Sequence, residues 1–121
     1  MAEEIDIEMT KIGANAAIVA FMSPSMSDVD AIAATSTKVK KYVKENQPCT
    51  LIFDFEAVKF FSSLVLGLLL DIRARLTAYN GEILISGINP QLHRVFKITN
   101  LDKVFRFFPD RQGAIDAANA D

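Results

Sequence analysis

Short apolar runs alternate with longer segments of helical periodicity along this chain. The first two runs are separated by a turn at residues 13–15, which favours a hairpin of two strands. A nearly continuous apolar run at Thr50–Phe55 is typical of a strand buried on both faces, so we expect it at the centre of a sheet. The predicted strands span residues 5–9, 16–21, 50–55, 82–86 and 104–108.

Four helices are expected between and after these strands. In the first, apolar residues recur three and four positions apart, and Ser27 with Asp30 suggests a capping box at its start. Asn80 and Asn100 lie where residues in the left-handed conformation would end the second and third helices. The predicted helices span about residues 29–43, 63–78, 90–100 and 111–119.

The element order β-β-α-β-α-β-α-β-α predicts an α/β fold. Crossovers of strand, helix and strand are right-handed and make successive strands parallel, while the first hairpin makes the sheet mixed. A chain of 121 residues has the size of one domain. We therefore predict a single domain over residues 1–121, with a mixed sheet of four to five strands and about four helices.

Composition supports a packed core and excludes several classes of partner. Half of the residues are hydrophobic and 23% are charged, which argues against disorder. Thirteen basic residues against fifteen acidic ones give a net charge of −2, so no nucleic-acid partner is expected. The acidic N-terminus and the single cysteine predict a reduced, cytoplasmic protein. The longest apolar run, residues 64–70, is too short for a membrane span.

Two loops should meet at the edge of the sheet where binding sites usually lie, beyond the carboxyl ends of the strands. They cover residues 22–28 and 56–63, and the second ends in two serines directly before a helix. A serine at such a position is usually an N-cap. Two serines allow Ser62 to cap the helix while Ser63 points outward, where a kinase could reach it. A phosphate there would be tolerated by the helix dipole, yet it would add nearly two negative charges to the surface.

The second helix begins with an unusually apolar segment. Its first two turns are apolar on every side, although one apolar stripe is enough to face a sheet. Either a second helix covers the remainder, or part of it forms an exposed patch that binds another protein. Gly67 would allow close backbone approach on the side that it faces. The apolar residues around Gly67 are Leu64, Val65, Leu66, Leu68, Leu69 and Leu70.

Residue patterns for catalysis are missing from the sequence. The one histidine, His93, lies at a polar helical position without a second metal ligand nearby, and we expect it to be solvated. Asp54 and Glu56 are not accompanied by a nucleophile or a histidine, so a structural or capping role is expected for them. We predict that the protein is not an enzyme, that it needs no cofactor and that it has no metal site.

Residues 51–67 resemble the core signature of STAS domains, the family that includes bacterial anti-sigma-factor antagonists. They read Leu-Ile-Phe-Asp-Phe-Glu-Ala-Val-Lys-Phe-Phe-Ser-Ser-Leu-Val-Leu-Gly, where the family has a strand with an acidic residue near its end, a short loop and then Asp-Ser-Ser-Gly-Leu-Gly at a helix start. Residues 81–85 and 89–105 continue the resemblance.

The resemblance implies roles for individual residues. Ser62 takes the place of the signature Asp, and Ser63 takes that of the phosphorylated serine; Leu64 and Val65 replace the second serine and the glycine. Asp28 resembles the acidic residue that family members place beside the site. The implied phosphorylation site is Ser63, with Ser62 as second choice. The implied partner-binding residues are Asp28, Ser62, Ser63, Leu64, Leu66 and Gly67.

The function that the resemblance implies is a partner switch. The unphosphorylated domain, a monomer or weak dimer, would bind an anti-sigma factor that is also a serine kinase. That kinase would phosphorylate Ser63 and be released, and a serine phosphatase would reset the system. Two alternatives stay open: a STAS scaffold subunit of a signalling or transport complex without phosphorylation, and a sensor of a small molecule or nucleotide.

Overall fold

The computed structural model describes residues 5–120, and its main sheet confirms the predicted α/β architecture. The five strands lie in the order β1-β2-β4-β6-β7; β1 is antiparallel to β2, and all other neighbours are parallel. The run expected at the centre of the sheet, β4, does lie there. The strands are β1 (Ile7–Ile12), β2 (Ala16–Phe21), β4 (Thr50–Asp54), β6 (Glu82–Ser86) and β7 (Arg106–Phe108).

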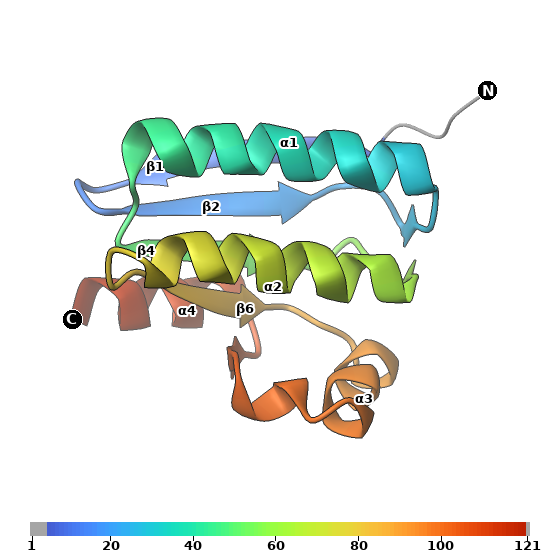
Figure 1. Ribbon diagram of the computed structural model, residues 1–121. Coiled ribbons are helices and arrows are strands. Elements are labelled where there is room, and N and C mark those ends of the chain that lie inside the picture. The colour runs from blue at the N-terminus through green and yellow to red at the C-terminus, as the bar shows by residue number, and fades with distance from the viewer. Residues whose placement is uncertain (1–4, 121) are drawn as a thin grey trace.

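Four helices cover the two faces of this sheet unequally. α1 and α2 lie side by side on one face, and α4 lies on the other (Figure 1). No helix within residues 5–120 combines the length and the apolar character needed to cross a membrane. The helices are α1 (Val29–Asn46), α2 (Ser63–Thr77), α3 (Pro90–Ile98) and α4 (Arg111–Ala120), and a short 3-10 helix spans Leu101–Lys103.

Burial on both sides explains why the central strands have no polar alternation. In β4, Leu51 and Phe53 belong to the large core under α1, α2 and α3, whereas Ile52 points to a smaller core under α4. Side chains alternate between the faces of a strand, so a strand covered on both sides needs apolar residues at every position. The smaller core consists of Ile18, Ala20, Ile52, Leu84 and Ala114.

A second, very small sheet was not predicted from the sequence. β3 (Ser25–Met26) and β5 (Phe60–Phe61) pair in parallel, with Ser25 opposite Phe60 and Met26 opposite Phe61. Two residues are too few to show a periodic pattern, and the sequence predicts both segments as parts of loops. This pairing joins the two loops at the carboxyl edge of the main sheet.

Most element boundaries follow the predictions, apart from the cap of α1 and two shifted strands. Asn80 and Asn100 are left-handed, with φ of 68° and 61°, as expected. The capping box at the start of α1 is wrong: the N-cap is Asp28, whose Oδ2 accepts a hydrogen bond of 2.9 Å from the Ala31 amide. The first strand begins and ends later than predicted, and β7 begins later because the 3-10 helix takes up the residues before it.

Gly67 should lower the stability of α2 without a packing benefit. It is exposed, and a Cβ built on it would meet no atom within 4 Å apart from its chain neighbours and the backbone of its own helix, so no other element of the described chain uses the close approach that glycine allows. We expect Gly67→Ala to raise the free energy of unfolding by about 0.5–1 kcal/mol, because alanine loses less entropy in a helix. Urea denaturation measures this change.

Gly87→Ala provides the matched control. Gly87 has φ of +67°, and its added Cβ would lie 3.0 Å from Asp54 Oδ1. This second variant should be destabilised because alanine is strained at positive φ. A loss of stability in Gly67→Ala would show that the space beside Gly67 is needed for folding.

Candidate functional site

Backbone hydrogen bonds hold the two predicted site loops together at the starts of α1 and α2. The Pro24 carbonyl accepts bonds from the amides of Lys59 and Phe60, at 2.8 and 3.1 Å, and the Met26 carbonyl accepts one from the Ser62 amide at 3.0 Å. Asp28, the N-cap of α1, is the last residue of the first of these loops. The two helix starts are therefore fixed relative to each other, and the residues predicted for the site are brought together.

Ser63 occupies the position expected for a modifiable serine. It is the first residue of α2, and it is exposed. The first turn of this helix contains no acidic residue, so the partial positive charge of the helix N-terminus is not offset there by a carboxylate of its own helix. A phosphate on Ser63 would be favoured by this dipole, and it would project from the protein surface.

Ser62 does not cap α2 with its side chain, so that prediction is wrong. Its backbone is at the N-cap position, but its hydroxyl makes no capping bond, and Oγ is buried without a hydrogen-bond partner. The Val65 amide donates instead to the backbone carbonyl of Ser62, at 3.0 Å. The residue type favours a cap, but here the hydroxyl lies in the interior and is not accessible to a kinase.

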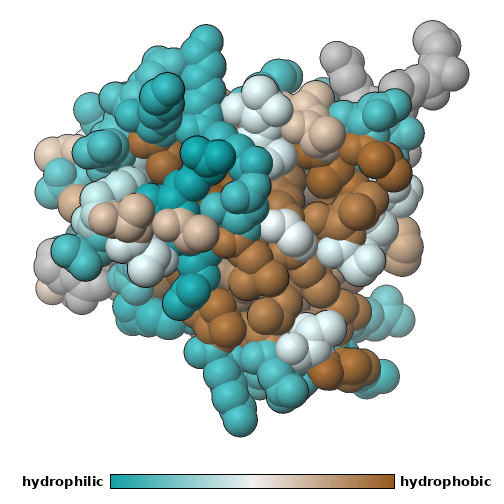
Figure 2. Space-filling view, viewed as in Figure 1, coloured by the Kyte–Doolittle hydropathy of each residue, from teal (hydrophilic) through white to brown (hydrophobic). Residues whose placement is uncertain are grey.

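The apolar start of α2 is covered only in part. Helix α1 packs against α2, and Leu66, one of the predicted partner-binding residues, is 7% exposed and belongs to the core. Leu64 remains 44% exposed, and the exposed side chains of Val29 and Phe60 extend from the two joined loops. Figure 2 shows apolar residues gathered on the half of this surface that lies over the starts of α1 and α2. One side of the helix start is therefore covered by α1, and part of its apolar surface is exposed.

We call this surface the docking face. It consists of Val29, Phe60, Ser63 and Leu64, with the half-buried Asp28 beside them. Gly67 lies one turn further along α2 and is exposed as well. The face combines a hydroxyl at a helix start with exposed apolar side chains, and exposed apolar patches often mark sites of protein interaction.

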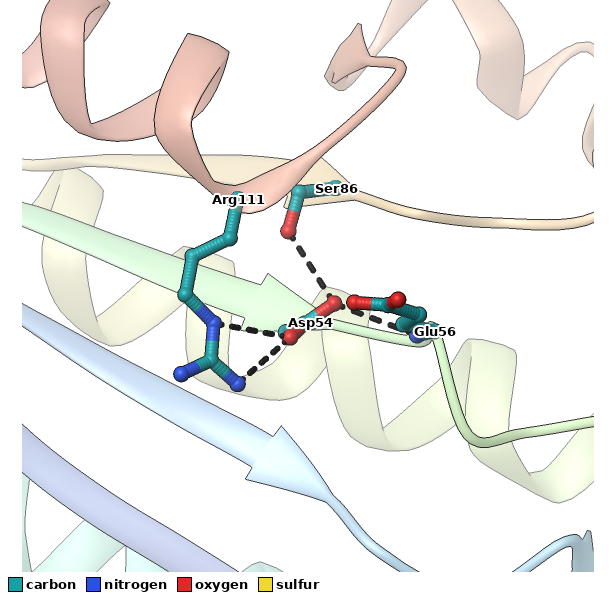
Figure 3. A network of polar contacts seen from close by, with 4 residues as sticks. All are labelled: Asp54, Glu56, Ser86 and Arg111. Carbon is teal, nitrogen blue, oxygen red and sulfur yellow. Dashed lines mark hydrogen bonds and ion pairs between the residues drawn. The ribbon is translucent and has the colours of Figure 1, made fainter.

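A polar network at the same edge of the sheet holds the end of β4 (Figure 3). Asp54 is 3% exposed, and its Oδ2 accepts bonds from Arg111 Nε and Nη2 at 2.9 and 2.6 Å. Its Oδ1 accepts from the Ser86 hydroxyl at 3.3 Å and from the Glu56 amide at 3.1 Å. Both carboxylate oxygens are thus used within the protein, which confirms the structural role predicted for Asp54.

Two further residues differ from expectation or were missed. His93 is half-buried and its ring lies 4.6 Å from the ring of Phe107, so the prediction of a solvated surface residue is wrong. Arg111 was missed because 57 positions separate it from Asp54 and no local pattern links them. Within residues 5–120, no group of three or more histidine, cysteine, aspartate or glutamate side chains is placed to hold a metal ion.

Removal of the Ser62 hydroxyl should not destabilise the protein. We expect Ser62→Ala to leave the free energy of unfolding unchanged or to raise it by up to about 1 kcal/mol, because a buried hydroxyl without a partner is removed. Asp28→Ala is the control, and it should cost about 1 kcal/mol because it removes a formed cap. Thermal or urea denaturation measures both, and a cost of about 1 kcal/mol for Ser62→Ala as well would show that Ser62 caps α2 in solution.

Loss of Arg111 should be costly because it leaves the Asp54 carboxylate buried without its cation. We expect Arg111→Ala to lower the free energy of unfolding by about 2 kcal/mol, less than for a fully buried pair, since the guanidinium is half exposed. Arg106→Ala, which removes an exposed ion pair with Glu82 and a cation–π contact with Phe108, should cost less, about 1 kcal/mol, because both contacts lie at the surface. Equal effects of the two substitutions in urea denaturation would contradict an anchoring role for Arg111.

Comparison with known proteins agrees with this fold. Residues 9–120 match the family model of the STAS domain. The structure of the anti-sigma factor antagonist SpoIIAA in its unphosphorylated form is 19% identical, with a TM-score of 0.83 over 96% of this chain and 98% of that chain. The phosphorylated form of the Bacillus cell fate determinant SpoIIAA is 20% identical, with a TM-score of 0.72 over 93% and 98% of the two chains.

An anti-sigma factor antagonist from Mycobacterium paratuberculosis is 23% identical, with a TM-score of 0.82 over 96% of this chain and 95% of that chain. Similarity at these identities shows a shared fold. The family match extends over nearly all of the described residues, including both loops and the start of α2. On this evidence the chain belongs to the STAS domain family.

Proposed function

We propose that this protein is an anti-sigma-factor antagonist that binds an anti-sigma-factor serine kinase through the docking face. When that kinase phosphorylates Ser63, the kinase dissociates from the protein. A serine phosphatase then removes the phosphate, and the protein can bind the kinase again. The observation that carries this proposal is the position of Ser63, an exposed hydroxyl at the first residue of α2, with exposed apolar side chains around it. In this function the protein has no catalytic step of its own, and it works in the cytoplasm.

The physical effect of a phosphate on this surface supports a switch. The apolar side chains of Leu64 and Phe60 bind a partner by losing their contact with water. A phosphate between the same two surfaces would have to lose its own hydration, which is far more costly for a charged group than for an apolar one. The helix dipole favours the phosphate in the free protein, so modification weakens binding without unfolding the domain.

The structural relatives support the same class of function. The proteins with which this chain shares its fold include anti-sigma factor antagonists, and SpoIIAA has been solved in both unphosphorylated and phosphorylated forms. The replacements of the family signature also fit the proposal. Val65 is buried and the Ser62 hydroxyl is buried, so these two replacements change the interior of the helix start and leave Ser63 and Leu64 at the surface.

The switch predicts different effects for two substitutions of Ser63. Ser63→Ala should bind the kinase but resist release when ATP is added. Ser63→Asp should lower the affinity at least about a hundredfold, because an unpaired carboxylate must be desolvated at the interface. Its stability should hardly change, since an acid is favoured in the first turn of a helix. Mass spectrometry after incubation with ATP and the kinase that copurifies from the protein's own host locates the phosphate. Calorimetric titration of each variant with the same kinase measures the affinity.

Thr10→Asp is the matched control, because it adds the same charge at an exposed position of the edge strand β1. This variant should bind like the wild type. Phosphate on Ser62 would reverse the assignment of the site. If neither serine carried phosphate and Ser63→Asp bound normally, the switch would be refuted and the scaffold function would take its place.

A further inference from the structure

A groove with two hollows runs between α1 and α2. The first hollow, about 240 Å³, lies toward the starts of the helices and is lined by apolar and small residues together with Asp71. The second, about 360 Å³, lies toward their ends, and its lining includes Lys40, Lys44 and Arg75. The ion pair between Lys40 and Asp71 joins the two helices where the hollows adjoin. The groove therefore changes from apolar to cationic along its length.

The apolar half owes its depth to small side chains. Ala33 and Ser36 on α1 and Gly67 on α2 leave room above the buried Ile32 and Leu68. The space beside Gly67 is open, since an added Cβ would meet no atom within 4 Å beyond its chain neighbours and the backbone of its own helix. A ridge of side chains from another helix fits such a depression between two helices. The exposed side chains of Val29 and Leu64 also line this half, which connects it to the docking face.

The other half carries positive charge that is not neutralised by ion pairs within residues 5–120. Lys44 and Arg75 are exposed, and neither forms an ion pair with any residue from 5 to 120. Tyr79 forms a neutral part of the wall: its hydroxyl donates to the Pro48 carbonyl at 2.9 Å, and burial, with a smaller contribution from Cys49, raises its pKa. This end is suited to carboxylates of a partner.

We propose that this groove binds a helix of the partner protein that has apolar side chains at one end and acidic side chains at the other. Leu64 and Arg75 are eleven positions apart in α2, a distance of about 16 Å, which is the length of about three helical turns. Asp28 and Asp30 at the apolar end and the cations at the other end give the groove a charge gradient that fixes the direction of the bound helix. The inference rests on the proposed function for the identity of the partner, since the groove begins at the docking face.

A synthetic helical peptide tests the groove without the partner. The probe is an alanine-based peptide of about four turns, with two leucines one turn apart near one end and two glutamates one turn apart near the other. We expect it to bind the full chain and to perturb the NMR amide signals of α1 and α2 along the groove. A peptide with lysines in place of the glutamates should bind roughly tenfold more weakly.

Charge-reversal variants make the test specific. The double variant Lys44→Glu with Arg75→Glu should reverse the preference and bind the lysine peptide more tightly than the glutamate peptide. Arg73→Glu is the control for Arg75→Glu, because it makes the same substitution two positions earlier in α2, at an exposed residue that does not line the groove. This variant should keep the wild-type preference for the glutamate peptide. Gly67→Leu should block both peptides by filling the apolar half, while the open space beside Gly67 lets the protein fold.

Several results would overturn the inference. Two of them are absence of peptide binding and equal binding of the two peptides. The third is dimerisation of the protein by itself that Gly67→Leu abolishes, because the groove would then bind a second copy of the chain.

Binding of the copurified kinase distinguishes this inference from the proposed function. If Ser63→Asp abolishes kinase binding and the double charge reversal does not weaken it, the groove is refuted and the switch stands. If the double reversal weakens kinase binding about tenfold but Ser63→Asp has no effect, the groove stands and the switch fails.

Discussion

The pairing of two loop backbones is the interaction on which the functional surface depends. The carbonyls of Pro24 and Met26 accept hydrogen bonds from the loop that follows β4, and this contact fixes the starts of α1 and α2 next to each other. Without it, Ser63 would end a loop of undefined position, and Val29 and Leu64 would not share one surface. Because the contacts use main-chain atoms, the side chains of both loops remain available for other roles.

The same loop is also fixed at its beginning. Asp54 at the end of β4 is held by Arg111 from α4 and by Ser86 from the neighbouring strand, so the loop starts from a buried and fully hydrogen-bonded point. Between this anchor and the paired segment there are only a few residues. The site is therefore rigidly positioned on its sheet, although it lies on loops, as binding residues often do.

Features that repeat along the chain could be predicted from the sequence. The first helix follows from the spacing of its apolar residues, and β4 from its continuous apolar run, because a strand buried on both faces is apolar at nearly every position. Features could not be predicted where the deciding contact is distant in sequence or depends on side-chain direction. Arg111 pairs with Asp54 across 57 positions, and two-residue strands have no period. For Ser62, residue type predicted a cap, but only the structure shows which way the hydroxyl turns.

The burial of the Ser62 hydroxyl limits the number of phosphates that this helix start can carry to one. The Ser62 hydroxyl is buried and Ser63 is exposed. Under the proposed function, each molecule therefore has two covalent states at this position, with and without a phosphate on Ser63. A protein with one modifiable hydroxyl responds to rising kinase activity along a simple saturation curve, without the threshold that several cooperating phosphates create. Any sharpness in the cellular response must then come from competition between kinase and phosphatase, and from the relative amounts of the partners, rather than from this domain.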